Sequence, residues 1–336
     1  MGSVRILSED DVRQGVSVQE AQQIIEQAFK DFANGISRMH ARVTVPIPDI
    51  AGNMRLLPAV KVLPTPSPMP PTRGYLGVKL YTGYVGPAFK DREKPRFVVL
   101  LYDMRDGALL AMIAARWLGA LRTGATSAVA TRHMARPGAA SLCIVGTGEQ
   151  AETQLLCVAS LLKPERIVVT SRDAAHREAF AAQAQAAGWN VSATGDCEDA
   201  ARTSDVICLA TTSREPVIRA GWIRPGTHIN AVGANVATRR EVDTDLVRAA
   251  RTVVEYRLQA LQEAGDLVIP VQEEAFSEDH IAAELGEIVT GAKPGRTSPE
   301  EITLFKSIGV AIEDVAMAAY VYERAVTQGA GTVVTM

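Results

Sequence analysis

The sequence lacks any long hydrophobic run. No apolar stretch in its 336 residues approaches the roughly 20 residues that a membrane-spanning helix needs, and its first residues, MGSVRILSEDDVRQG, have no signal-peptide core. It also lacks an excess of positive charge, because the formal net charge is -3. Such a balance gives no electrostatic attraction to nucleic acid or to an anionic membrane. We therefore expect a cytoplasmic protein that binds neither.

Cysteine and histidine are scarce and widely spaced. The four cysteines, Cys143, Cys157, Cys197 and Cys208, form no CxxC pair. The five histidines show no HExxH or other paired spacing. We therefore expect no metal site, and we expect Cys143 and Cys208, which lie in apolar runs, to be buried and reduced. A G-x-S-x-G nucleophile motif is also missing.

The composition that remains is that of a globular protein, with 47% hydrophobic and 22% charged residues. The length suffices for about two domains. Near the N-terminus, Ser17 and Glu20 form a capping box ahead of a helix that Gly35 ends. The predicted core face of this helix comprises Val18, Ala21, Ile25, Ala28, Phe29 and Phe32.

Residues 41–113 change to short β-type runs broken by proline and glycine, and the last of them forms a hairpin that turns at RDG. LPTPSPMPPT within this region predicts a stiff surface connection. From SLCIV onward strands and helices alternate, with helices over 149–162 and 174–187. This alternation predicts an α/β fold with a parallel sheet covered by helices on both faces. We expect residues 298–329 to close the chain as one or two helices.

The segment SLCIVGTGEQAET matches G-x-G-x-x-A at Gly146, Gly148 and Ala151. A buried strand precedes it and a helix follows, which is the context of a dinucleotide site. Gly146 permits the tight turn, Gly148 lets the backbone approach a pyrophosphate, and Ala151 allows close helix–strand packing. The alternative is a tight turn that holds no ligand.

The end of the second strand indicates which dinucleotide binds. An NAD site commonly has an acidic residue there, whereas this sequence has Ser171 and Arg172. A guanidinium pairs well with a 2′-phosphate, so we predict NADP(H). NAD(H) is the alternative, in which Arg172 is a solvated surface residue and Asp173 takes the acidic role.

The chain as a whole resembles the ornithine cyclodeaminase/μ-crystallin family. The motifs that carry the resemblance are GVKLYTGY, RWLGALRTGATSAVATRHMA, HINAVGANVATRREVD and GRTSPEEITLFKSIGVAIEDVAMAAYVYERA. The resemblance implies a Rossmann-type doubly wound NAD(P)-binding domain over 121–302. It also implies a discontinuous α+β substrate-binding and dimerisation domain over 1–120, to which 303–336 return, and therefore a homodimer.

The resemblance also assigns site residues. Arg42, Lys79 and Arg122 match the cluster that grips a substrate carboxylate, and Lys79 is a candidate proton donor. The cofactor contacts that it implies, beyond the glycine turn and Ser171–Arg172, are Thr123, Glu149, Gln150, Thr211, Val232 and Gly233. Without the resemblance, the alternative interpretation is that Arg42 lies on a solvated strand face and that the Lys79 side chain extends to solvent.

One position departs from the family. Cyclodeaminases carry an aspartate general base at the end of a VGGD motif, and here the motif is VGAN, which places Asn235 at that position. An amide takes up no proton at neutral pH, whereas reduction of a preformed imine needs no such base. We therefore predict an oxidoreductase, an NADPH-dependent reductase of cyclic imino acids such as pyrroline-2-carboxylate or piperideine-2-carboxylate. The alternatives are a cyclodeaminase, an amino acid dehydrogenase and a non-catalytic binding protein for NADPH and a small acid.

Overall fold

The structure is a computed structural model that describes residues 2–47, 52–63, 73–84 and 97–336. Two compact units divide the chain, one formed by residues 1–122 with 310–336 and the other by residues 123–309. Helix α3 (Arg116–Met134) supplies its first turns to one unit and the remainder to the other. The proline-rich connection predicted at LPTPSPMPPT lies almost wholly outside the described residues.

The first unit is an α+β arrangement built on a mixed sheet. Its strands run in the order β16-β1-β7-β6-β5-β4-β2, with β3 paired to β4. Only the β1–β7 pairing is parallel among the named pairs of this sheet. Besides the start of α3, its elements are β1 (Ser3–Leu7), α1 (Glu9–Gly15), α2 (Val18–Ala33), β2 (Arg38–Met39), β3 (Val43–Ile47), β4 (Gly52–Leu63), β5 (Arg73–Tyr84), β6 (Phe97–Asp103), β7 (Leu109–Ala114), α11 (Ala311–Gln328) and β16 (Thr332–Thr335).

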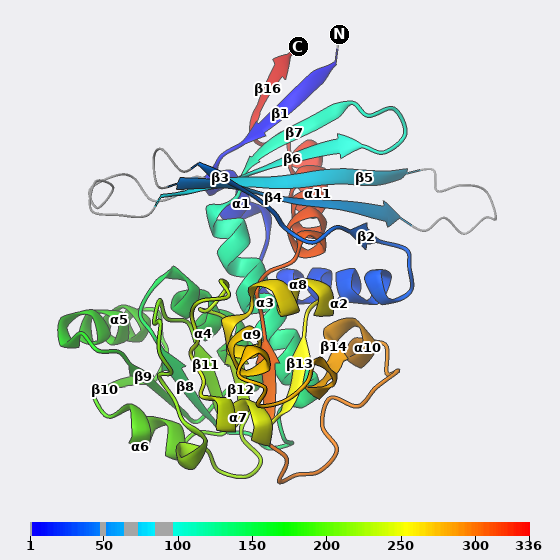
Figure 1. The fold of residues 1–336 in the computed structure, drawn as a ribbon. Coiled ribbons are helices and arrows are strands. Elements are labelled where there is room, and N and C mark those ends of the chain that lie inside the picture. Colours follow the sequence, from blue (N-terminus) through cyan, green and yellow to red (C-terminus); the bar gives the residue numbers. More distant parts are fainter. Residues whose placement is uncertain (1, 48–51, 64–72, 85–96) are drawn as a thin grey trace. The chain divides into compact units, whose positions relative to one another are not determined.

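Helix α11 lies against the sheet and against α2 (Figure 1). The absence of a side chain at Gly77 on β5 leaves room for Val315 of α11, because a methyl group there would overlap the valine. Tyr75 donates a hydrogen bond to Glu323 of α11 at 2.7 Å. The predicted capping box of α2 is confirmed, since Glu20 accepts from the Ser17 amide at 2.8 Å and Ser17 Oγ accepts from the Glu20 amide.

The second unit is built on a parallel sheet of order β10-β9-β8-β11-β12-β15-β13-β14, and every named pairing in it is parallel. Short 3-10 helices lie at Ala220–Trp222 and Glu278–His280. Besides the remainder of α3, its elements are β8 (Ser141–Val145), α4 (Glu149–Leu162), β9 (Arg166–Thr170), α5 (Ala174–Ala186), β10 (Val191–Thr194), α6 (Cys197–Arg202), β11 (Val206–Leu209), β12 (His228–Ala231), α7 (Thr244–Ala249), β13 (Arg251–Val254), α8 (Arg257–Glu263), α9 (Gly265–Gln272), β14 (Ile281–Glu284), α10 (Leu285–Val289) and β15 (Thr303–Lys306).

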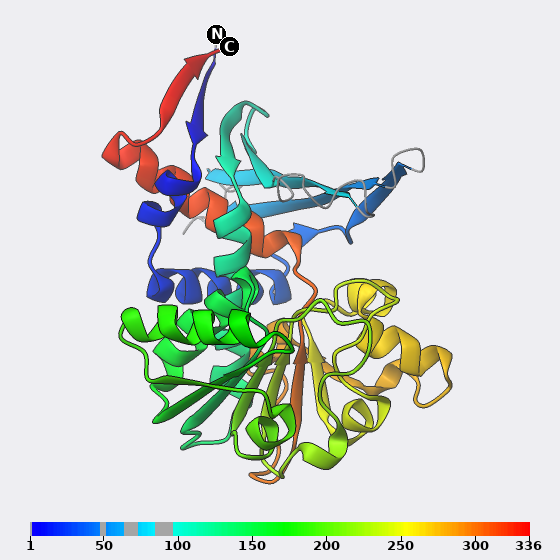
Figure 2. The same cartoon turned by 90° about the vertical axis from the view of Figure 1, so that its left-hand side faces the viewer.

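This strand order is that of a Rossmann-type doubly wound sheet. From β8 the chain builds outward through β9 and β10, then returns to the other side of β8 with β11 and β12. It continues to β13 and β14 farther out, and β15 then inserts between β12 and β13. Helices cover both faces of the sheet (Figures 1 and 2). The inner strands are therefore buried on both faces, which explains the apolar runs of β8, β9 and β11, whereas the edge strands β10 and β14 are only partly buried. The predicted burial of Cys143 and Cys208 is confirmed, and both are free thiols.

The expectation that residues 298–329 are helical is correct only for Ala311–Gln328. Residues 298–302 and 307–310 lie outside helices and strands, and Thr303–Lys306 form β15, which lies between β12 and β13 and is fully buried. Four residues are too few to show a periodicity that separates strand from helix, so only their place in the sheet decides. The chain consequently passes between the two units after Gly309, whereas the sequence placed this crossing before Thr303.

Candidate functional site

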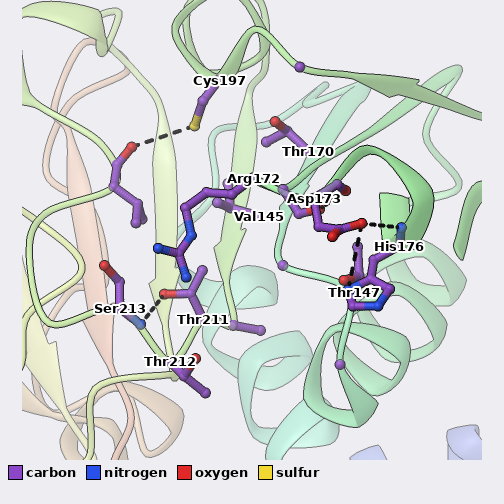
Figure 3. Close-up of a pocket in the computed structure, with 16 residues that line it drawn as sticks. Val145, Thr147, Thr170, Arg172, Asp173, His176, Cys197, Thr211, Thr212 and Ser213 are labelled. Carbon is purple, nitrogen blue, oxygen red and sulfur yellow. Dashed lines mark hydrogen bonds and ion pairs between the residues drawn. The ribbon is translucent and has the colours of Figure 1, made fainter. Parts of the chain in front are cut away.

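A cavity of about 870 Å³ opens in the second unit at the carboxyl ends of β8, β9 and β11 (Figure 3). These ends include the place where the direction of strand addition reverses, which is where doubly wound sheets bind their ligands. The lining residues are Val145, Gly146, Thr147, Gly148, Thr170, Ser171, Arg172, Asp173, His176, Gly195, Cys197, Ala210, Thr211, Thr212, Ser213 and Val217. The cavity lies within the volume range of ligand pockets.

The glycine turn after β8 is shaped for close approach. Gly146 has φ of +116°, a conformation that side chains disfavour, and a methyl group there would overlap the Ala210 carbonyl. Gly148 has an ordinary φ, and an added methyl group would meet no atom within 4 Å, so open space lies beside its backbone. Gly148 is also the N-cap of α4, and no side chain caps this helix end. The turn therefore leaves the first N–H groups of α4 without a capping side chain, as an anion site at a helix N-terminus requires.

The residues after β9 form the adjacent wall. Figure 3 shows the Arg172 side chain extending toward Thr211 and Ser213. Asp173 is the N-cap of α5, and its Oδ1 accepts a hydrogen bond from the His176 amide at 2.8 Å. This bond holds the pKa of Asp173 below its usual value. The Asp173 carboxylate thus has a structural task at the start of α5.

The first unit contains a buried cluster of charged side chains. Lys79 Nζ lies 2.8 Å from Asp314 Oδ1, and Arg122 Nε donates to the same oxygen at 3.2 Å. Arg122 also pairs with Glu313 through Nη1 at 2.6 Å. Both carboxylate side chains are completely buried. A planar guanidinium is suited to bridging two carboxylates in this way.

Arg42 belongs to the same cluster. It is buried, and its charge is one of the influences that lower the pKa of Lys79. Burial is the largest cause, and Arg122 also lowers the pKa, while Asp314 raises it, so that the pKa of Lys79 falls from 10.5 to about 8. Burial raises the pKa of Asp314, but Arg122 and Lys79 outweigh it and leave that pKa below its usual value. Three cations and two carboxylates are therefore buried in this cluster.

The structure thus brings the predicted substrate residues together in one unit. Of the predicted cofactor residues, Gly146, Gly148, Ser171, Arg172 and Thr211 line the cavity. The others lie outside its lining, and their cofactor roles stay predictions: Thr123, Glu149, Gln150, Ala151, Val232 and Gly233. Asn235 is exposed on the loop after β12, and its role likewise stays a prediction.

Sequence reasoning missed Glu313 and Asp314. They stand inside a quoted family motif, GVAIEDVAMAAY, without an assigned role. Two adjacent acids among apolar residues at the start of a helix are a usable signal, because buried acids are rare unless they are paired. His176 and Ser213 of the cavity were also missed, and no spacing in the sequence points to them.

The described part of the chain contains neither a metal-binding cluster nor a membrane-spanning helix. No group of three or more histidine, cysteine, aspartate or glutamate side chains in this part of the chain is arranged to hold a metal ion. No helix there combines the length and apolar character needed to cross a membrane.

Comparison with known proteins identifies the family. Residues 3–329 match the model of the ornithine cyclodeaminase/mu-crystallin family. The chain belongs to this family. It is 34% identical to a Δ1-pyrroline-2-carboxylate reductase of Bacillus cereus, over 97% of this chain and 98% of the relative.

Two solved structures of family members have the same fold over nearly their whole length. The Δ1-pyrroline-2-carboxylate reductase of Thermococcus litoralis, in complex with NADH and L-proline, is 35% identical, with a TM-score of 0.90 over 98% of this chain and 99% of that one. An archaeal alanine dehydrogenase dimer with bound NAD is 30% identical, with a TM-score of 0.92 over the whole of both chains. These three relatives are all oxidoreductases, and both structures contain a nicotinamide cofactor.

Proposed function

We propose that this protein is an NADPH-dependent reductase that converts cyclic ketimine carboxylates, such as pyrroline-2-carboxylate and piperideine-2-carboxylate, to cyclic L-amino acids. Its class as an oxidoreductase acting on carbon–nitrogen bonds follows from the family and from relatives along the whole chain. The observation that carries the finer proposal is the buried cluster in which carboxylates hold Lys79 and Arg122 in the same unit as the buried Arg42.

The cluster fits a small carboxylate. Glu313 and Asp314 are fully buried and hold Arg122 and Lys79 in place, so little side-chain freedom remains to be lost when substrate binds. The cations of the cluster suit a substrate carboxylate, because charge-assisted hydrogen bonds in a dry site are strong. Such fixed donors orient the imine carbon for reaction.

The reaction adds one hydride and one proton across the C=N bond. When bound, the nicotinamide supplies the hydride to the imine carbon. The pKa of Lys79 is lowered to about 8, so its Nζ is still protonated at neutral pH. Proton transfer is efficient when the pKa of the donor lies near the working pH, as it does here. We assign Lys79 to holding the substrate carboxylate and to supplying the proton. Asn235 takes no part in proton transfer.

The preference for NADPH over NADH is part of the proposal. Ser171 and Arg172 line the cavity where the adenosine ribose is expected, and no acid immediately follows β9. Asp173, the candidate acid for an NAD site, caps α5 through Oδ1. An arginine beside a helix N-terminus favours a phosphate there. The NADH and NAD of the two solved relatives make NADH the alternative to be tested.

The test is oxidation of NADPH or NADH by the purified protein with each of three candidate substrates, and ammonia release from a fourth, ornithine, with NADP⁺ or NAD⁺. Pyrroline-2-carboxylate and piperideine-2-carboxylate should be reduced, with proline or pipecolate as product. Pyruvate with ammonia should give little turnover, and brisk alanine formation would instead establish an alanine dehydrogenase. Cofactor binding without turnover on any imine would establish a non-catalytic binding protein.

Ornithine is the fourth arm, because it distinguishes a cyclodeaminase. Cyclodeamination requires several proton transfers, to which a positioned carboxylate contributes about 10²–10⁴-fold. We expect almost no ammonia release from ornithine, and a trace in Asn235→Asp. Brisk ammonia release by the unmodified protein would replace the reductase assignment with a cyclodeaminase.

The cytoplasmic location and the homodimer also belong to this proposal. The family likeness and the dimeric archaeal relative support them. Light scattering of the purified protein measures the assembly directly, and a monomer at working concentration would contradict the homodimer.

A further inference from the structure

The Glu241 carboxylate joins two loops of the second unit that are far apart in sequence. Its Oε1 accepts hydrogen bonds from the Thr211 amide at 2.7 Å and the Thr211 hydroxyl at 2.8 Å. Its Oε2 accepts from the amides of Gly233 at 2.6 Å and Ala234 at 3.2 Å. Glu241 is completely buried. One carboxylate thus ties the chain after β11 to the chain after β12.

This connection imposes strict shape requirements. A methyl group on Gly233 would overlap both the Thr211 carbonyl oxygen and the Glu241 carboxylate. The Thr211 hydroxyl donates to Glu241 and accepts from the Ser213 amide at 3.2 Å, so its orientation is fixed. Glycine at 233 and threonine at 211 are therefore both explained by the presence of this carboxylate.

Glu241 is in turn held from behind. Its own amide donates to Asp266 Oδ1 at 2.6 Å, and the Val242 amide donates to the same oxygen at 3.1 Å. Lys306 on β15 pairs with Asp266 at 2.9 Å, and both side chains are fully buried. Lys306 also donates to the Ala231 carbonyl at the end of β12 at 3.1 Å. The chain of contacts returns to the loop from which it started.

The contacts of Glu241 suit a carboxylate. Burial raises the pKa of Glu241 above its usual value, and the Lys306 charge and the Thr211 hydrogen bonds offset this only in part. Each carboxylate oxygen accepts from at least one backbone N–H, and these groups only donate. The geometry of the contacts therefore favours the charged form against the effect of burial.

The strand order shows which half of a dinucleotide these loops serve. In a doubly wound sheet the pyrophosphate lies at the first glycine turn, here after β8, and each half of the dinucleotide lies over one half of the sheet. The adenosine half belongs to β8, β9 and β10. The loops that follow β11 and β12 therefore belong to the nicotinamide half.

We propose that Glu241 is a positioning residue for the nicotinamide half of the cofactor, because it fixes the loops 211–213 and 232–234 relative to each other. The proposal rests on the proposed nicotinamide cofactor and does not depend on the identity of the imine. Glu241 acts through the backbone of these loops, since it is fully buried beneath them.

The test compares a whole dinucleotide with a fragment that lacks the nicotinamide ring and its ribose. Isothermal titration calorimetry measures the Kd of NADP⁺ and of 2′-phospho-ADP, or of NAD⁺ and ADP if NAD⁺ binds more tightly. Glu241→Gln replaces one acceptor oxygen with an NH₂ group that faces N–H donors. We expect the preference for the whole dinucleotide over the fragment to fall about tenfold, in line with one lost buried hydrogen bond, while the fragment binds as before.

Asp205→Asn is the matched control. Asp205 is also buried, and its Oδ2 accepts from the Ala140 and Ser141 amides at 3.0 and 3.1 Å. It ties down the amino ends of β8 and β11, at the edge of the sheet opposite the cavity, so the preference should stay at the unmodified value even if the protein is destabilised. An unchanged preference in Glu241→Gln, or equal weakening of dinucleotide and fragment, would overturn the proposal.

A second variant decides the case in which Glu241→Gln does not fold. Thr211→Val keeps the shape of the side chain and removes the hydroxyl that donates to Glu241, and it should lower the same preference. An unchanged preference in a folded Thr211→Val would then overturn the proposal. Because no imine is present, a failure of the proposed reduction leaves this result unaffected, and the two failures are distinguishable.

Discussion

Burial and three charged neighbours from distant parts of the sequence set the pKa of Lys79, and burial is the largest cause. Asp314, 235 positions away, accepts its hydrogen bond. Arg122 and Arg42 contribute repulsion. The pKa of this lysine is therefore a property of the cluster, and changes in the partners should appear in the pH dependence of the reaction.

The first prediction concerns that pH dependence. Lys79 is protonated below its pKa of about 8 and loses the proton as pH rises through it, so kcat/KM for imine reduction should fall above about pH 8. Asp314 raises the pKa of Lys79, so in Asp314→Asn the fall should begin at lower pH. Initial rates across a pH series for both proteins measure this. Titration of the imine is common to both profiles, and coincident profiles would contradict the role of Lys79.

The second prediction concerns Arg172. Loss of a charge-assisted phosphate contact is worth about 1.5–3 kcal/mol, so Arg172→Ala should raise the KM for NADPH roughly ten- to a hundredfold and leave that for NADH nearly unchanged. Arg248→Ala is the control, because Arg248 is half exposed and pairs with Asp245 on α7 of the same unit. Equal losses for both cofactors would show that Arg172 does not read the 2′-phosphate.

Helices α3 and α4 contrast a glycine that close packing requires with a glycine that lines a cavity. Gly124 on α3 faces the Thr153 carbonyl of α4, and an added methyl would overlap it and lie 3.0 Å from Cys157 Sγ. Gly148 at the start of α4 faces open space and lines the cavity. The same substitution should therefore have opposite consequences at the two positions.

The third prediction is that contrast. Gly124→Ala should destabilise the protein by about 1–3 kcal/mol, the usual range for overpacking, and lower its Tm. Gly148→Ala should keep the Tm of the unmodified protein, since its φ of -87° suits alanine, but weaken dinucleotide binding because the methyl extends from a cavity wall. Thermal unfolding without ligand and calorimetric titration with dinucleotide separate the two. A large fall of Tm in Gly148→Ala would contradict the conclusion that Gly148 faces open space.

The division into two units separates the two halves of the proposed chemistry along the chain. All the residues that line the cavity lie between Val145 and Val217, in the second unit. The cluster of Arg42, Lys79, Arg122, Glu313 and Asp314 belongs to the first. Changes in the cluster should therefore affect reduction of the imine without altering the affinity for cofactor.

The fourth prediction tests this separation with Arg122→Lys. Lysine keeps the positive charge that the buried Glu313 and Asp314 need, whereas alanine would leave them short of a partner and endanger folding. The lysine ammonium lacks the planar guanidinium with which Arg122 bridges both carboxylates. The kcat/KM for the imine should therefore fall about 10²-fold, because the substrate is misplaced. The Kd of the dinucleotide should not change. Arg105→Lys is the control and should alter neither value, because Arg105 is an exposed arginine that pairs with Asp103 in the same unit. A changed Kd in Arg122→Lys would contradict the separation.

The amino-acid sequence alone determined the features that depend on neighbouring residues. The capping box at Ser17, the hairpin at RDG and the start of α4 at the glycine turn follow from local backbone preferences, and the structure has all three. The alternation of strands and helices sufficed for the α/β class, because a parallel sheet needs a crossover after each strand. The resemblance to the family assigned Arg42, Lys79 and Arg122 to one cluster from the sequence alone.

Tertiary structure alone decided which groups share a buried environment. The run Thr303–Lys306 is β15 because it fits between β12 and β13, and no local periodicity distinguishes it from helix. Asp314 and Glu241 act on residues distant in sequence, through contacts that exist only when both partners are desolvated. The strength of those contacts depends on burial, and burial is a property of the folded chain that no short stretch of sequence contains.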